Sequence, residues 1–213
     1  MSVSDLDLMA SAIRGCTACL EAGLIPVANP VFRGRAYHRF MIVGQAPAAI
    51  GHTQPAYAGP AGTKLRAWLA EAGFSGGDLL TDNFYLTSVT RCFPGPSISG
   101  KGDRMPTPAE VRLCAGHLDR EIAFVRPVLV VTLGKLATNV LAGPGSLTDL
   151  VGTVREAERA GCRFTVVPFP HPSGVSHWLN GEPGRSCLTR AVVQLREVRE
   201  RLVVPQFDAA ARA

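Results

Sequence analysis

The sequence predicts an α/β protein, a three-layer α/β/α sandwich around a four-stranded, mostly parallel sheet. Three observations lead to this fold class. The chain has 213 residues, 46% hydrophobic and 18% charged, which suits one domain with a buried core. Four short apolar runs lack clean alternation, which is typical of strands buried on both faces of a parallel sheet. Helical patterns lie between these runs, so strands and helices alternate along the chain.

The expected strands are rich in Val, Ile, Leu, Thr or Phe and cover Phe40–Val43, Phe84–Val89, Val128–Leu133 and Phe164–Phe169. A first helix is expected over Ala61–Ala72, since Leu65, Trp68 and Leu69 recur at helical spacing. Gly73 then ends the pattern.

The second helix has a strong start signal. Thr107 is an expected N-cap, Pro108 suits the first helical position, and Glu110 completes a capping box. This helix can run to about Val125, before an Arg-Pro pair. Two further helices are expected over Lys135–Leu141 and Gly184–Leu202.

Residues 1–204 are expected to form one domain, and residues 205–213 a frayed tail. No apolar run approaches the roughly 18 residues needed to cross a bilayer. The N-terminus carries two acidic residues and no basic stretch, unlike a secretory signal, so we expect a cytoplasmic protein without a membrane partner. The whole net charge of +5 lies in residues 91–213, which indicates either a surface for a polyanion or a solvated arginine-rich surface.

Polar residues follow each of the expected strands. Gln45 comes after the first strand, and Ser88 lies near the end of the second. Lys135 follows the third strand, and His171 opens a His-Pro-Ser-Gly turn after the fourth. Because ligands of open α/β sheets bind beyond the carboxyl ends of the strands, these side chains predict a site at that edge.

Four cysteines are spaced as metal ligands. Cys16 and Cys19 form a Cys-x-x-Cys pair, Cys92 follows the second strand, and Cys114 lies within the second helix. Two intervening residues let both thiolates of the pair bind one ion or cluster. A redox pair is the alternative for Cys16 and Cys19 alone, and the spacing does not separate zinc from an iron–sulfur cluster. The cysteines expected to be ordinary buried thiols are Cys162 and Cys187.

The order of the motifs resembles a known family. GQAPA follows the first strand, AYAGPAGTKL starts the first helix, TSVTRC precedes PTPAEVRLC, RPVLVVTLG forms the third strand, and PHPSG follows the last. From about Cys16 to Leu202 the chain is similar to the uracil-DNA glycosylase superfamily, within it to the iron–sulfur branches, families 4 and 5. The resemblance implies a monomeric, nucleoid-associated DNA repair enzyme that flips out uracil, or another deaminated base, and hydrolyses its N-glycosidic bond.

The resemblance also implies roles for single residues. His171 would donate to the departing uracilate, and Tyr57 would stack on the base. The alternatives are a structural His and a surface or core Tyr. The rest of the base pocket would be Gln45, Ala46, Ala48 and Ser88. The expected contacts to DNA phosphates are Ser173, Arg91, Lys101 and Arg104. The ligands of a [4Fe-4S] cluster, or of zinc as the alternative, would be Cys16, Cys19, Cys92 and Cys114.

The first motif departs from the family. Gln45 stands where family 4 has Glu, and Ala46 stands where family 1 has Asp, so the usual water-activating carboxylate is missing from both positions. His52, in the loop expected to overhang the pocket, is the candidate for positioning or deprotonating water, with an exposed loop His as the alternative. Two other functions stay open: a damaged-DNA-binding protein with weak catalysis, and an unrelated α/β metalloprotein with a redox pair at Cys16 and Cys19.

Overall fold

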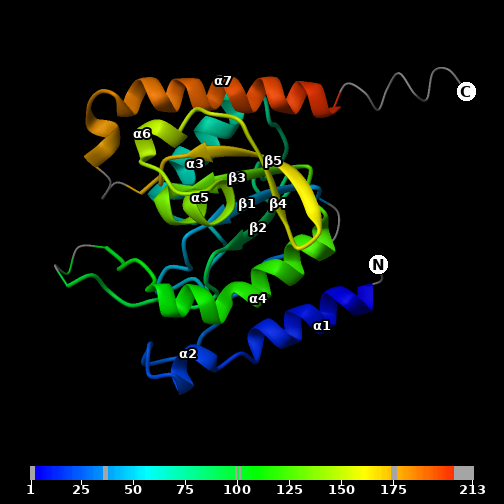
Figure 1. Cartoon of the computed structure of the whole chain (residues 1–213), viewed down its shortest axis with the longest axis vertical. Helices are drawn as coiled ribbons and strands as arrows, with labels where there is room; N and C mark the ends of the chain where they lie inside the picture. Colours follow the sequence, from blue (N-terminus) through cyan, green and yellow to red (C-terminus); the bar gives the residue numbers. More distant parts are fainter. Residues whose placement is uncertain (1–2, 36–37, 99, 101, 174–176, 204–213) are drawn as a thin grey trace, which may run out of the picture.

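A computed structural model describes residues 3–35, 38–98, 100, 102–173 and 177–203 (Figure 1). Its centre is a five-stranded sheet in the order β2-β1-β3-β5-β4. The strands are β1 (Phe40–Gly44), β2 (Tyr85–Ser88), β3 (Leu129–Leu133), β4 (Arg155–Arg159) and β5 (Cys162–Phe169). Neighbouring strands among β2, β1, β3 and β5 pair in parallel, and β4 pairs antiparallel with β5. The α/β class and the four expected strands are therefore confirmed.

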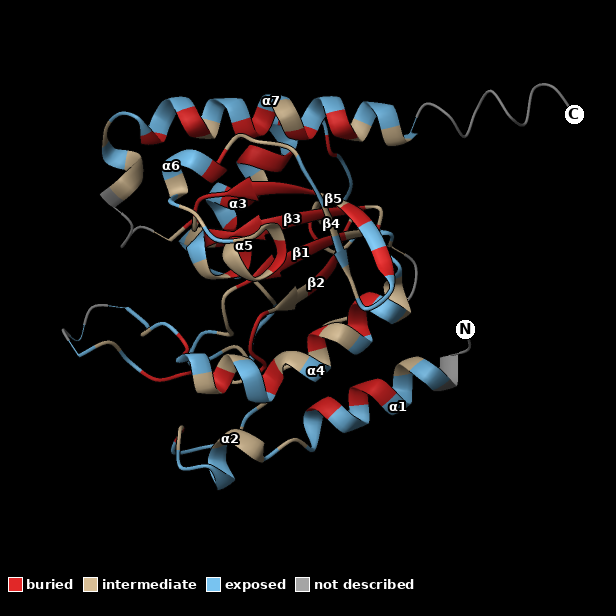
Figure 2. Cartoon of the chain, in the orientation of Figure 1, coloured by how far each residue is buried: buried red, intermediate tan, exposed pale blue. Residues whose placement is uncertain are grey.

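The predicted strand number of four is wrong, because β4 is a fifth strand. Its sequence, Arg-Glu-Ala-Glu-Arg, contains no apolar run, and it lies exposed at the edge of the sheet (Figure 2). Ala160 and Gly161 connect it to β5 with φ values of 51° and 70°, which suits a tight two-residue hairpin turn. Charged side chains on an edge strand discourage pairing with other chains. Because β4 carries such side chains, a search for apolar runs does not find it.

Helices cover both faces of the sheet (Figure 1). On one face, α3 (Pro60–Glu71) and α7 (Gly184–Val203) share a buried apolar cluster with side chains of β1, β3 and β5. On the other face, α4 (Pro108–Val125) and α5 (Gly134–Ala142) share a second cluster with the opposite side chains of the strands. This arrangement confirms the three layers. The shorter helices in the described residues are α2 (Ala18–Glu21), α6 (Leu147–Leu150) and the 3-10 helix η1 (His177–Asn180).

The capping box before α4 is present as predicted. The Glu110 N–H donates to Thr107 Oγ1 at 3.3 Å, and the Thr107 N–H donates to Glu110 Oε2 at 2.6 Å. This start fixes the register of α4 and with it the position of Cys114 on the buried side.

An N-terminal helix, α1 (Val3–Arg14), was not predicted. It packs against α4 and buries Met9, Ala10 and Ile13 (Figure 2). Within the described ranges, no helix is both long and apolar enough to span a membrane. The expected tail, residues 205–213, lies outside the described residues.

Candidate functional site

A cavity of about 350 Å³ lies at the carboxyl edge of the sheet. Gly44 and Ser88 end β1 and β2 in register, and β5 leads through Pro170 into His171. Gln45, Ser88 and His171 all line the cavity, as the order of the strands predicts. Lys135 follows β3 at the same edge, as predicted, but it is exposed and is not among the lining residues. The volume falls in the range of small-molecule sites, roughly 300–1,000 Å³.

The His171 ring has a defined donor side. Its Nδ1 accepts a hydrogen bond from the Ser173 N–H at 3.2 Å and contacts Ser173 Oγ at 2.9 Å. Since a backbone N–H can only donate, Nδ1 carries no proton, and in the neutral ring Nε2 carries it. Burial lowers the pKa of His171 and keeps the ring neutral. These contacts leave a neutral imidazole whose Nε2–H has no hydrogen-bond partner among the residues that the structure describes.

Two glycines leave the space that Tyr57 occupies in the cavity wall. Its backbone adopts a φ of 56°, in the left-handed region that side chains rarely occupy. A Cβ at Gly44 would lie 2.8 Å from the Tyr57 hydroxyl, and one at Gly62 would lie 1.7 Å from the Tyr57 carbonyl oxygen. Arg66 donates to that carbonyl at 3.0 Å and holds the strained turn. The aromatic ring is therefore fixed by its surroundings before any ligand binds.

The first motif forms the neighbouring wall. Gln45, Ala46 and Ala48 all line the cavity. The Gln45 side-chain amide reaches the Arg104 carbonyl oxygen at 3.5 Å, so it ties this wall to the loop before α4. Ser88 also lines the cavity, but its hydroxyl donates to the Thr90 carbonyl oxygen at 2.7 Å. A contact between Ser88 and a base stays a prediction.

The structure does not bring His52 to the cavity. Backbone turns fold the loop so that Ile50, Gly51 and Gln54 line it, whereas His52 is exposed and is not among the lining residues. The role predicted for His52 in handling water is therefore not supported. Sequence reasoning missed Arg33, whose guanidinium lines the cavity and donates to the carbonyl oxygens of Gly51 and Gln54. No motif marks it, because its partners are backbone atoms about twenty residues away.

The four cysteines expected to bind metal line one small cavity. They are Cys16, Cys19, Cys92 and Cys114, brought from the segment after α1, the segment after β2, and α4. Burial, as the larger cause, and the neighbouring thiols together raise the pKa of Cys92 to about 11. Thiolates crowded in this way require a cation to hold them in the ionised form. Among the described residues, no three His, Cys, Asp or Glu side chains are placed to hold a metal ion as they stand.

The other two cysteines are buried elsewhere, as predicted. Cys162 lies at the start of β5 and Cys187 in α7, and neither lines the cavity of the four thiols. The four cysteines that line the small cavity are thus distinct from Cys162 and Cys187 in their location as well as in their sequence spacing.

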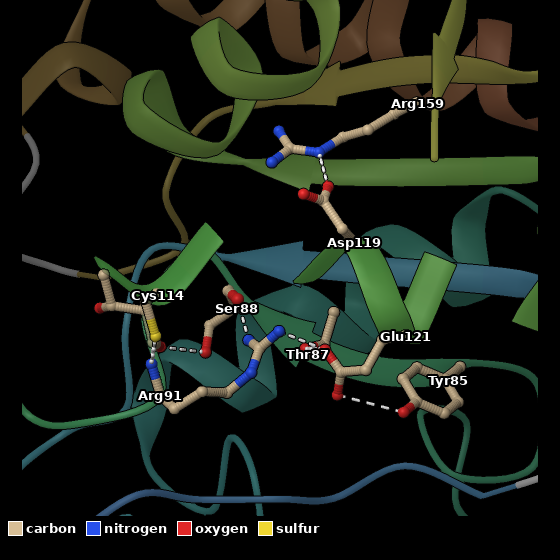
Figure 3. A network of polar contacts seen from close by, with 9 residues as sticks. Tyr85, Thr87, Ser88, Arg91, Cys114, Asp119, Glu121 and Arg159 are labelled. Carbon is tan, nitrogen blue, oxygen red and sulfur yellow. Dashed lines mark hydrogen bonds and ion pairs between the residues drawn. The ribbon is translucent and has the colours of Figure 1, made fainter. Parts of the chain in front are cut away.

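Arg91 is buried, which corrects the expectation that it contacts DNA. Its guanidinium pairs with Glu121 and donates to the Ser88 carbonyl oxygen, and each charged residue is 1% exposed (Figure 3). Glu121 also accepts from the Thr87 hydroxyl at 2.7 Å and from the Tyr85 hydroxyl at 3.1 Å. A guanidinium enclosed in this network has no access to a phosphate.

The remaining predicted DNA contacts have different positions. Arg104 pairs with both carboxylate oxygens of Glu110, at 2.7 and 2.8 Å, so it anchors its loop, and a contact with phosphate stays a prediction. Ser173 lines the cavity and contacts His171, and its grip on a phosphate likewise stays a prediction. Lys101 lies outside the described residues.

Comparison with protein families decides the relationship. A family model described as the uracil DNA glycosylase superfamily matches residues 33–196, which include β1 to β5 and every described residue that lines the larger cavity except Val31. The chain belongs to this superfamily.

Individual members of the uracil-DNA glycosylase superfamily are similar over much of the chain. A protein of Archaeoglobus fulgidus named Type-4 uracil-DNA glycosylase is 30% identical over 141 residues, 63% of this chain and 65% of that protein. One of the same name from Saccharolobus solfataricus is 27% identical over 207 residues, 94% of this chain and 88% of that protein. A third, from Pyrobaculum aerophilum, is 25% identical over 181 residues, 80% and 84% of the two chains.

Proposed function

We propose that the protein is a DNA repair glycosylase that flips uracil, or another deaminated base, into the larger cavity and hydrolyses its N-glycosidic bond. The observation that carries this proposal is the cavity with a neutral His171 in its wall, because the Ser173 contacts leave Nε2 as a donor. The names of the similar proteins support the same substrate. DNA is accordingly the proposed partner, and the cytoplasm, at the nucleoid, the proposed location.

The proposed chemistry depends on stabilising the leaving group. As the bond between the sugar C1′ and the uracil N1 lengthens, negative charge grows on the uracil and the sugar becomes oxocarbenium-like. The Nε2–H of His171 donates to a uracil carbonyl oxygen and stabilises that charge, and Tyr57 stacks on the ring. One well-placed donor of this kind contributes about 3–4 kcal/mol to the transition state.

We further propose that Cys16, Cys19, Cys92 and Cys114 hold a [4Fe-4S] cluster. The donor set fits, since such clusters take four cysteine thiolates. The four thiols line one cavity, so a single bound group can reach all of them, and iron and sulfide content distinguishes the cluster from a zinc ion held by the same thiolates. The role proposed for the cluster is structural, namely to hold the segments that carry the cysteines together.

Release of free uracil from a uracil-containing oligonucleotide, single- and double-stranded, tests the proposed function. His171→Ala should lose at least about 10²-fold in single-turnover rate, because the donor to the uracilate is gone. His52→Ala is the matched control and should lose much less, since His52 is exposed and outside the cavity lining. A His171→Ala protein at the wild-type rate would show that the site is placed wrongly. Tight binding of the uracil strand without release would favour a damage-binding protein instead.

A further inference from the structure

The larger cavity contains a carboxylate that the motifs do not reveal. Gln45 and Ala46 leave the first motif without an acid, yet water must still attack the sugar in the proposed reaction. Among the described residues that line the cavity, Asp103 is the one with a carboxylate. It lies near the end of the polar loop between β2 and α4, 15 residues after Ser88 in the sequence.

The backbone around Asp103 is fixed on both sides. Asp103 forms an isolated antiparallel bridge with Pro96, and the next residue, Arg104, donates its N–H to the Gly95 carbonyl oxygen at 3.0 Å. The Arg104 guanidinium binds both carboxylate oxygens of Glu110, which itself caps α4. The base of this hairpin is therefore tied to a helix of the domain, which gives Asp103 a defined position.

Asp103 lies beside the first motif. The Gln45 amide reaches the carbonyl oxygen of Arg104, one residue from Asp103, at 3.5 Å, and Gln45 and Asp103 line the same cavity. Gln45 stands at the position where family 4 members have a Glu. The Asp103 carboxylate is thus supplied from another segment to the neighbourhood in which that Glu would act.

The Asp103 carboxylate is available for chemistry. Within the described part of the chain, no side chain or backbone N–H is found to bond to it, and its side chain is exposed enough to meet water. Its partial burial in the cavity wall raises the pKa of Asp103. A carboxylate with a raised pKa is a better proton acceptor than one in bulk water.

We infer that Asp103 is a catalytic residue, the group that orients the attacking water and accepts its proton. This inference rests on the proposed function. The bond between C1′ and N1 breaks, and its electron pair leaves with uracil as an anion held by His171. The water oxygen bonds to C1′, and one water proton moves to the Asp103 carboxylate. Passing that proton to solvent or to uracilate regenerates the carboxylate, so one water is consumed and no atom is oxidised or reduced.

Single-turnover uracil release by a set of variants tests the role of Asp103. Asp103→Asn keeps the shape and removes the base, and it should lower the rate by about 10²-fold or more. Its Kd for the uracil-containing strand and its Tm should stay close to the wild-type values. Adding Gln45→Glu to Asp103→Asn places a carboxylate on the adjoining wall and should recover at least tenfold of the lost rate. Asp7→Asn, with the same charge change on the exposed side of α1, should leave the rate unchanged.

Each outcome has a definite meaning. An Asp103→Asn protein at the wild-type rate would overturn the inference. So would a slow Asp103→Asn protein that loses DNA binding and thermal stability in parallel and that Gln45→Glu does not restore, because those results indicate a structural hairpin. A wild-type protein that releases no uracil would overturn the proposed function itself, and it is recognised before any variant is measured.

Discussion

Gly134 allows His171 to approach the end of β3. It has a φ of +83°, and a Cβ there would lie 3.2 Å from His171 Cβ. Gly44 and Gly62 stand in the same relation to Tyr57, as their missing side chains leave room for that residue. At the scale of single residues, the positions of His171 and Tyr57 thus depend on glycines that do not themselves line the cavity.

Gly134→Ala should therefore impair catalysis as well as stability. Alanine is strained at positive φ by about 1–3 kcal/mol. The added methyl group should also displace His171, and a shift of about 1 Å in a catalytic group can cost about 10² in rate. Gly143→Ala is the matched control, because Gly143 has a φ of +89° and open space around its Cβ position. Single-turnover rates and Tm values should show a similar stability loss in both and a rate loss only in Gly134→Ala; equal rates would contradict the proposed placement of His171.

At the scale of elements, the buried pair of Arg91 and Glu121 joins α4 to β2 and to the segment that carries Cys92 (Figure 3). The Arg91 N–H also donates to Cys114 Sγ at 3.2 Å, so a backbone group beside the pair contacts one of the four thiols. The same guanidinium holds the carbonyl oxygen of Ser88 at the cavity edge. One ion pair thus links the cysteine site to the end of the strand that lines the cavity.

Glu121→Gln should destabilise the protein strongly, because it leaves the Arg91 charge buried without its partner. Breaking a buried pair in this way costs about 3–5 kcal/mol, and each kcal/mol lowers the Tm of a domain this size by about 2–4 °C. A fall of roughly 6–20 °C is expected in thermal unfolding of the holoprotein. Glu158→Gln breaks an exposed pair with Arg163 and should cost about 0–1 kcal/mol. Equal Tm values for the two variants would contradict the structural role of the buried pair.

At the scale of the whole molecule, the four cysteines that line the small cavity come from segments that the sheet does not join. Cys16 lies between α1 and α2 and Cys19 lies within α2, both outside the residues matched by the superfamily model, whereas Cys92 and Cys114 lie within them. A group bound to all four would hold the N-terminal segment to the domain. It would also constrain the unfolded chain across long loops, as a cross-link does.

Purified protein should contain iron and sulfide in the ratio of one [4Fe-4S] cluster per chain. Cys16→Ala should lose that iron and lower the Tm, since the N-terminal segment is then released. Cys187→Ala removes a buried thiol outside the cluster cavity and should keep the full iron content. Metal analysis and visible absorption decide the matter: stoichiometric zinc with no iron or sulfide, in the wild-type protein, would overturn the proposed cluster.

The sequence alone determined the layers of the fold and much of the cavity edge. Apolar runs and the Thr107 cap placed four strands and the helices between them, because burial on both faces and helix capping act through residues close in sequence. The positions of Gln45 and His171 at the cavity were predictable for the same reason. Gln45 directly follows β1, and His171 follows β5 after one proline. The charged edge strand β4 and helix α1 were not predicted from the sequence. Strand β4 is stabilised by pairing with β5, and α1 by packing on α4, and neither contact is visible in the local pattern.

Only the tertiary structure decided the features that depend on contacts between residues distant in sequence. Arg91 was predicted to contact DNA at the surface, but it is buried and paired with Glu121, thirty residues away in the sequence. His52 followed the motif in sequence, yet backbone turns left it outside the cavity lining. Asp103 entered the cavity because a hairpin anchored through Arg104 carries it there. A local pattern sets which residues start and end an element, but the site is completed by side chains brought together across the fold, and no spacing in the sequence records those distances.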